Sequence, residues 1–116
     1  MKPEAVIVLD VGKTNKKAAV YDHDFRVRAE DRISLGPAEW QGLEVERTDE
    51  LLAWFRKTFR AFSQQFNPRA IGVCAHGATF ALLDANGTLA LPVLSYTSPA
   101  GAARRRSSAH RASRMN

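Results

Sequence analysis

The first third of the chain alternates between apolar runs and short polar interruptions. Residues 5–9 form a continuous apolar run rich in β-branched side chains, which is typical of a strand buried on both faces. Residues 17–21 and 25–35 resume a strand pattern after turn-forming residues at 10–15 and 22–24. The pattern predicts a meander of three antiparallel strands.

One helix is predicted in the middle of the chain. Residues 36–47 contain two glycines and a proline and show no clear period, so we expect a loop there. A helix should begin at Thr48 or Asp49 and end at Asn67 and Pro68, because proline disfavours a helical residue before it. Its apolar residues recur at helical spacing and form one stripe: Leu51, Leu52, Phe55, Phe59, Phe62 and Phe66.

The remaining apolar segments predict another buried strand and a hairpin. Residues 70–75 indicate a second buried strand, and residues 78–83 and 89–96 indicate two shorter strands. Residues 84–87 (Asp-Ala-Asn-Gly) predict a tight turn between them. The order of three strands, a helix, a strand and a hairpin places the chain in the α/β class with a mixed sheet.

The net charge of +5 belongs to the C-terminal end. All twelve acidic residues lie within residues 1–97, together with an equal number of lysines and arginines, so this part is neutral. Residues 98–116 consist mostly of Ala, Arg and Ser, which cannot build a core, and predict a basic, disordered tail. Residues 1–97 are therefore not expected to be a nucleic-acid module, and nucleic acid or acidic surfaces could bind only through the tail.

Cysteine usage and hydropathy favour a cytoplasmic protein. The single cysteine, Cys74, excludes a disulfide framework within one chain, and we expect it to be a buried, small apolar residue. No segment approaches the ~20 apolar residues that cross a bilayer. The N-terminal run at residues 5–9 is too short for a signal peptide.

The candidate chemistry lies at the first turn, from Asp10 to Asn15. A buried strand delivers a carboxylate to its end, and Gly12 allows close approach of the backbone to a ligand. Consecutive N–H groups in such a turn bind anions, and a nearby aspartate can hold a hydrated Mg²⁺. The alternative of a nucleotide-binding P-loop ending at Gly12-Lys13-Thr14 requires a glycine where Ile7 stands, and it requires a helix where the pattern indicates a strand.

Two segments together resemble a known family. The stretch from Asp10 to Lys17 resembles the first phosphate-binding loop of the actin, hexokinase and sugar-kinase superfamily. The segment from Gly72 to Tyr96, with its His-Gly pair, its Leu-Leu-Asp-x-x-Gly hairpin and its proline-containing return, resembles the FGGY carbohydrate kinases. Its spacing is most similar to the rhamnulokinase and fuculokinase branch. The resemblance covers about residues 5–97.

This resemblance implies a ribonuclease H-like (actin-like ATPase) domain that phosphorylates a sugar with ATP and Mg²⁺. Asp10 would lie near the triphosphate and hold Mg²⁺ through water. Gly12, Thr14 and Asn15 would line the phosphates, and Lys17 matches the basic position on the second strand.

The resemblance also implies a sugar-binding role for two later residues. His76 and Gly77 would face the sugar. Lys13 departs from the threonine or serine common at its place in the family, and it could reach a phosphate or point to solvent.

Each of these residues also has a plainer interpretation. Asp10 could simply cap a turn, and Lys16 and Lys17 could be solvated strand charges. His76 could be a hydrogen-bonded structural residue.

The resemblance further implies that much of a kinase is missing. In the family, the catalytic aspartate, the second phosphate loop and the adenosine pocket lie downstream in a second domain. We therefore expect residues 1–97 to be a partial, truncated N-terminal kinase domain that is inactive alone, and the tail at 98–116 to be the product of a frameshift or gene truncation. The alternatives are another actin-like ATPase or sugar-binding regulatory protein, and a non-enzymatic interaction protein with a basic arm.

Overall fold

The computed structural model describes residues 1–97, which divide into two compact units. Unit 1 combines Met1–Gly36 with Arg47–Gly77, and unit 2 combines Pro37–Glu46 with the described residues from Ala78 onward. The predicted basic tail, residues 98–116, lies outside the described residues. Within residues 1–97, no helix has the length and apolar character that a bilayer span requires.

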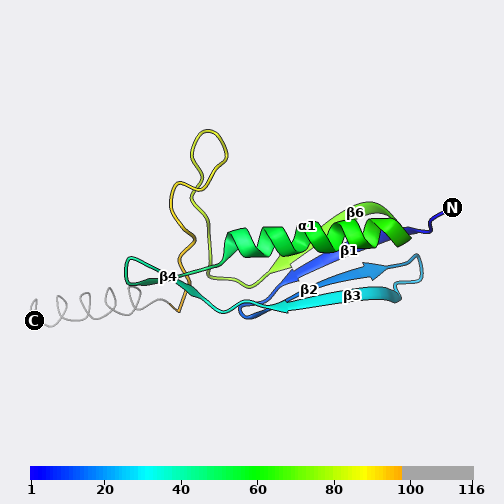
Figure 1. Cartoon of the computed structure of the whole chain (residues 1–116), viewed down its shortest axis with the longest axis horizontal. Coiled ribbons are helices and arrows are strands. Elements are labelled where there is room, and N and C mark those ends of the chain that lie inside the picture. Colours follow the sequence, from blue (N-terminus) through cyan, green and yellow to red (C-terminus); the bar gives the residue numbers. More distant parts are fainter. Residues whose placement is uncertain (98–116) are drawn as a thin grey trace, which may run out of the picture. The chain divides into compact units, whose positions relative to one another are not determined.

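Unit 1 is built on a mixed four-stranded sheet. Strands β1 (Glu4–Val11), β2 (Asn15–Tyr21) and β3 (Val27–Ser34) form an antiparallel meander, which confirms the predicted opening. Strand β6 (Asn67–Ala75) pairs with β1 in parallel, so the order is β3-β2-β1-β6 (Figure 1). A strand now occupies the segment where a P-loop would need a helix, which excludes that alternative.

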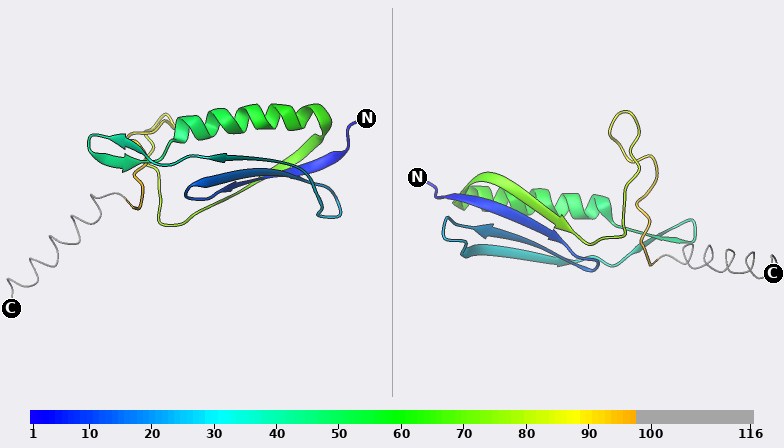
Figure 2. Two further views of the ribbon diagram at one scale, coloured as in Figure 1. Left: turned by 60° about the horizontal axis from the view of Figure 1, so that its bottom comes forward. Right: turned by 180° about the vertical axis from the view of Figure 1, so that it is seen from behind.

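Helix α1 (Thr48–Gln65) covers one face of this sheet (Figure 2). It begins and ends where the sequence predicts. Asp49 and Glu50 lie in its first turn, where acidic side chains interact favourably with the helix dipole. Arg47 forms an ion pair with Glu50 at 2.9 Å.

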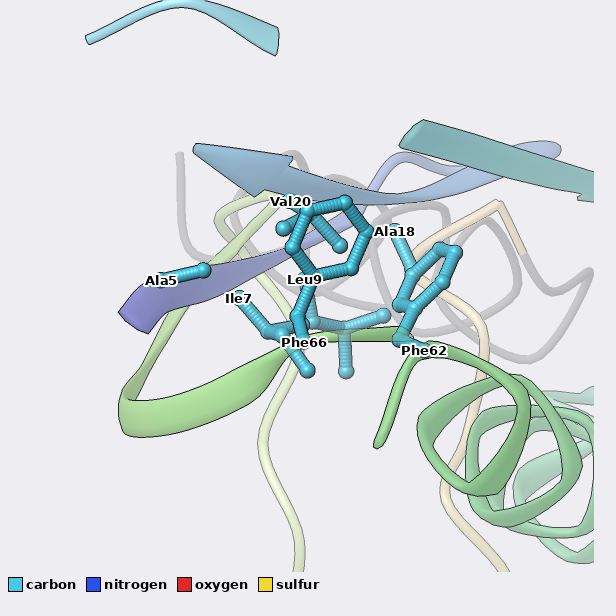
Figure 3. Close-up of a cluster of buried hydrophobic side chains, with 7 residues drawn as sticks. All are labelled: Ala5, Ile7, Leu9, Ala18, Val20, Phe62 and Phe66. Carbon is cyan, nitrogen blue, oxygen red and sulfur yellow. The ribbon is translucent and has the colours of Figure 1, made fainter. Parts of the chain in front are cut away.

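The core of unit 1 lies between α1 and the α1-facing side of β1 and β2. Alternate residues of each strand point to this side, and the C-terminal end of the helix contributes two phenylalanines (Figure 3). The buried cluster comprises Ala5, Ile7, Leu9, Ala18, Val20, Phe62 and Phe66. The predicted apolar stripe is wrong at Leu52, which is 50% exposed because it lies off the face that meets the sheet.

The prediction that residues 70–75 form a buried strand is wrong in its burial. Strand β6 is an edge of the sheet, with β1 on one side only, and Ile71 and Val73 are 47% and 65% exposed. Cys74, expected to be buried, is likewise exposed. The apolar composition predicted the strand correctly, but burial depends on neighbours that residues 1–97 do not supply.

The predicted loop at residues 36–47 contains a short hairpin that belongs to unit 2. Strand β4 (Ala38–Trp40) pairs with β5 (Leu43–Val45) in antiparallel. Gln41 and Gly42 connect them with φ angles of 51° and 77°. Positive φ at both central residues matches the right-handed twist of a two-residue hairpin. The short strands lack the length that would reveal a period in the sequence.

Residues 78–97 hold the predicted turn but not the predicted strands. Asp84 Oδ1 accepts hydrogen bonds from the backbone N–H groups of Asn86 and Thr88, which fixes the turn. Beyond the turn, the described residues pair only over short stretches, at the bridges Leu83 to Leu89 and Val45 to Leu94 and the backbone hydrogen bonds beside them. The strands predicted at 78–83 and 89–96 are therefore wrong as continuous strands, because each segment pairs over only a few residues.

Candidate phosphate-binding site

Two parallel strands bring the predicted site residues to one edge of the unit 1 sheet. Strands β1 and β6 run in the same direction, so their carboxyl ends lie side by side (Figure 1). Asp10 is directly opposite Cys74, and the backbone N–H of His76 donates to Val11 O at 2.9 Å. The segments at 10–15 and 76–77, distant in sequence, therefore meet at this edge.

The β1–β2 turn is tight, and its geometry depends on glycine. Gly12 N donates to Asn15 O at 3.0 Å, which leaves Lys13 and Thr14 as the two connecting residues. A Cβ atom at Gly12 would lie 2.5 Å from Asn15 O, closer than real Cβ atoms approach. Glycine is therefore required here for close approach of two backbone segments within the turn, whereas the expected approach of the backbone to a ligand stays a prediction.

The outer residues of the turn are fixed by the end of β3. Leu35 N donates to Thr14 O at 2.9 Å, and Ser34 Oγ donates to Asn15 Oδ1 at 2.8 Å. Thr14 and Asn15 are both exposed. The turn thus presents polar groups to solvent on a backbone that three strands hold in place.

A row of polar side chains crosses the sheet on the face opposite α1. The register places Cys74 opposite Asp10, Asp10 opposite Lys17, and Lys17 opposite Arg32. These positions alternate with the core residues of the same strands, so their side chains share the open face. Asp10 and Lys17 put opposite charges on directly opposed positions one residue pair before the turn begins.

The pKa of Cys74 depends on its neighbours in this row. Its thiol lies 3.8 Å from Leu9 O. Partial loss of hydration raises the pKa of the Cys74 thiol, and the neighbouring Asp10 carboxylate raises this pKa further, because a negative charge disfavours the thiolate. A raised pKa disfavours the thiolate, so Cys74 lacks the lowered pKa of an activated nucleophile.

Lys16 is the residue that sequence reasoning missed. It was interpreted as a possible solvated strand charge, yet it is only 3% exposed and points to the α1-facing side of β2. Its ammonium Nζ donates to Lys13 O at 2.8 Å and to Leu35 O at 3.4 Å. The strand alternation gave no signal, because Lys16 is in phase with Ala18 and Val20 while Lys17 is in phase with Ala19 and Tyr21, which are apolar as well.

The structure places His76 and Gly77 beside the turn. His76 is half-buried, and its Nδ1 lies 3.3 Å from Gly77 O. A Cβ atom at Gly77 would meet nothing within 4 Å, so space alone does not require glycine there. Their role toward a sugar stays a prediction.

The residues present suit a water-bound Mg²⁺ better than a metal cage. Within residues 1–97, no cluster of three or more His, Cys, Asp or Glu side chains could hold a metal ion. Asp10 is an exposed carboxylate at the edge that also carries the turn. Mg²⁺ commonly keeps several waters and binds through one or two carboxylates together with phosphate oxygens, which fits this single ligand.

Known proteins similar to this chain are sugar kinases. No protein-family model matches the chain. An L-fuculokinase from Salmonella typhi is 30% identical over 112 residues, covering 89% of this chain and 23% of that enzyme. The chain thus spans about a quarter of the length of this curated relative.

Solved structures give the same assignment. A carbohydrate kinase from Novosphingobium aromaticivorans superposes with a TM-score of 0.74 at 30% identity, covering 88% of this chain and 22% of that one. A gluconate kinase from Lactobacillus acidophilus has a TM-score of 0.77 at 15% identity, covering 93% of this chain and 23% of that one, and supports the fold. The chain therefore has the actin-like ATPase fold of the sugar kinases, of which it spans about a quarter of the length. Its resemblance to the FGGY-type carbohydrate kinases is confirmed.

Proposed function

We propose that the chain forms the phosphate-binding part of an ATP-dependent carbohydrate kinase in the cytoplasm. One observation carries the proposal: the Gly12 turn, the Asp10–Lys17 pair and the end of β6 meet at a single edge of the sheet. This edge combines a tight polar turn, a lysine cation and an exposed carboxylate. These are the groups that a Mg²⁺-bound triphosphate needs.

Each part of the edge has a distinct role in this proposal. The turn from Gly12 to Asn15 binds phosphate oxygens through backbone N–H groups and the polar side chains of Thr14 and Asn15. Lys17 supplies positive charge, and Lys13 is an additional phosphate contact. Asp10 orients Mg²⁺ through water, and the metal neutralises charge on the phosphates when bound.

The sugar would bind at the neighbouring end of β6. His76 and Gly77 directly follow β6 and lie beside the β1–β2 turn. A sugar hydroxyl bound there would therefore lie beside the terminal phosphate. The relatives named above act on sugars or sugar acids, and the transfer would be of a phosphoryl group to an alcohol. Which sugar is accepted depends on residues outside this edge.

We further propose that residues 1–97 are a partial N-terminal kinase domain that is inactive alone. The chain corresponds to about a quarter of its relatives' length. Phosphoryl transfer depends on holding both substrates and the developing charge from all sides. One edge of one sheet can bind phosphates but does not surround them.

Nucleotide binding by the full chain tests the site. We expect Mg²⁺-ATP to bind measurably in isothermal titration calorimetry, and Asp10→Asn to weaken binding about tenfold or more, because it removes a charge-assisted metal contact. Glu4→Gln is the matched control, since Glu4 lies on the same strand and face at the far end. Equal binding by wild type and Asp10→Asn would contradict the proposal.

Catalysis is tested separately. ADP formation by the full chain should not rise above the ATP-only rate when pentoses, deoxyhexoses or polyols are added. Sugar-dependent turnover, lost in Asp10→Asn, would show that the chain is a complete enzyme and would overturn the inactivity proposal alone.

A further inference from the structure

Lys16 places a cation beneath the candidate phosphate-binding turn. Its side chain is almost fully buried on the side of β2 that faces α1, while Lys17 points to the open face. Burial of an ammonium is unfavourable unless hydrogen bonds replace its water. Here the replacement acceptors are two backbone carbonyls, Lys13 O and Leu35 O.

The contact with Lys13 O constrains the orientation of the turn. The carbonyl of Lys13 and the N–H of Thr14 belong to one planar trans peptide, in which the two groups point in opposite directions. The ammonium draws the carbonyl toward the α1-facing side at 2.8 Å. The Thr14 N–H is therefore turned away from Lys16, toward the exposed side of the turn.

The contact with Leu35 O extends this constraint to the end of β3. Leu35 N already donates to Thr14 O, so the N–H of Leu35 bonds directly to the turn while its carbonyl accepts from Lys16. Nζ lies 3.4 Å from Leu35 O, and a lysine ammonium has three hydrogens to distribute. One side chain thus connects the turn to the strand that supports it.

We propose that Lys16 is a positioning residue that holds the Lys13–Thr14 peptide of the turn with its carbonyl inward and its N–H outward, ready for phosphate. The proposal rests on the phosphate-binding function proposed above. Lys16 does not touch the ligand. Its ammonium acts through the backbone and adds positive charge behind the turn, which favours an anion on the outer side.

Amide exchange in the nucleotide-free chain tests the positioning role directly. In Lys16→Met, the protected amides of Gly12 and Leu35 should exchange about ten- to a hundredfold faster, as expected for loss of hydrogen bonds to a charged group. Amides of Ile7 and Val20, in the centre of the sheet, should be unchanged. Lys16→Arg should restore protection, because it keeps a cationic donor.

Nucleotide binding then links the turn to function. Lys16→Met should weaken Mg²⁺-ATP binding about tenfold, and Lys16→Arg should recover most of it. Lys17→Met should weaken binding while leaving exchange at Gly12 and Leu35 unchanged, because its side chain lies on the other face. This crossed pattern separates a positioning residue from a direct contact.

The outcomes are distinguishable. Unchanged exchange at Gly12 and Leu35 in Lys16→Met would overturn the role of Lys16. Faster exchange with no Mg²⁺-ATP binding by wild type would uphold the restraint on the turn and defeat the phosphate function. If Lys16→Met fails to fold, the test is made on the wild-type chain by NMR. A slowly exchanging Lys16 ammonium resonance supports the proposal, and the absence of this resonance overturns it.

Discussion

At the residue scale, the candidate site depends on the size of one side chain. Gly12 has no Cβ, and this permits the 3.0 Å hydrogen bond from its N–H to Asn15 O. Any larger residue must move the backbone of the turn, because the neighbouring oxygen is main chain and cannot rotate away. Gly36, by contrast, has open space around it.

We therefore expect Gly12→Ala to destabilise unit 1 by about 1–3 kcal/mol, the usual cost of forcing extra atoms into a packed site. Mg²⁺-ATP binding should weaken with it. Gly36→Ala is the matched control and should change the free energy of unfolding by less than about 0.5 kcal/mol. Urea titrations followed by circular dichroism compare the two, and equal stability would show that the turn tolerates a Cβ.

The Cys74 thiol provides a second residue-scale test that needs no nucleotide. Because its pKa is raised, its thiolate fraction and its alkylation rate should be low near neutral pH and should rise as pH increases through the raised pKa. Asp10→Asn removes a negative neighbour, which lowers the thiol pKa and increases the rate at a given pH, by roughly tenfold for each pKa unit recovered.

Maleimide labelling followed by mass spectrometry measures these rates. Glu4→Gln serves as control, because Glu4 lies on the same face but pairs with Asn67 at the other end of the strands. Labelling that responds equally to both substitutions would place Asp10 away from Cys74.

At the element scale, α1 is joined to the sheet by more than its phenylalanines. Asp31 lies on the α1-facing side of β3, and its Oδ2 accepts hydrogen bonds from Trp54 Nε1 at 3.2 Å and Thr58 Oγ1 at 2.9 Å. Thr58 is buried among apolar residues, so this carboxylate satisfies a hydroxyl that would otherwise lose its water.

Asp31→Ala should therefore destabilise unit 1 by about 1–3 kcal/mol, because it leaves two helix donors without their acceptor. Glu30→Ala is the matched control: Glu30 is the adjacent residue on the opposite face, and its exposed ion pair with Arg32 is expected to contribute less than about 1 kcal/mol. Thermal unfolding monitored at 222 nm compares them, and similar melting temperatures would contradict a structural role for Asp31.

Elements with a clear period were predictable from the sequence, and those fixed by pairing were not. The meander and α1 carry periods of two and about 3.6 residues, which local sequence records directly. The β4–β5 hairpin was missed because its strands have three residues each and Gln41 does not signal a positive φ. The strands expected at 78–83 and 89–96 have the right composition, but they pair with each other and with β5 over only a few residues.

The candidate site was largely predictable for the same reason. Asp10 and the turn follow a strong strand signal, and the resemblance to sugar kinases added His76 and Gly77 at the adjacent strand end. Lys16 was not predictable from composition, because its burial depends on the register of β2 against β1 and β3. Only that register distinguishes it from Lys17.

At the scale of the whole molecule, the chain has more apolar surface than its core can cover. In unit 1, one uncovered part lies at the β6 edge, where Ile71 and Val73 point to the same side as α1 and are 47% and 65% exposed. Ile71, Phe55 and Phe59 line an open hollow of about 240 Å³ together with Arg56 and Arg60.

This surface should bind apolar dyes in the folded state. We expect the native chain to enhance the fluorescence of 8-anilinonaphthalene sulfonate, which binds exposed apolar patches. Val73→Lys should reduce the enhancement severalfold, because it places a charge beside Ile71 in the patch. Val27→Lys is the matched control, since Val27 is a similarly exposed valine on β3, the opposite edge strand. If both variants bind the dye as wild type does, the β6 edge is not the exposed apolar surface of the molecule in solution.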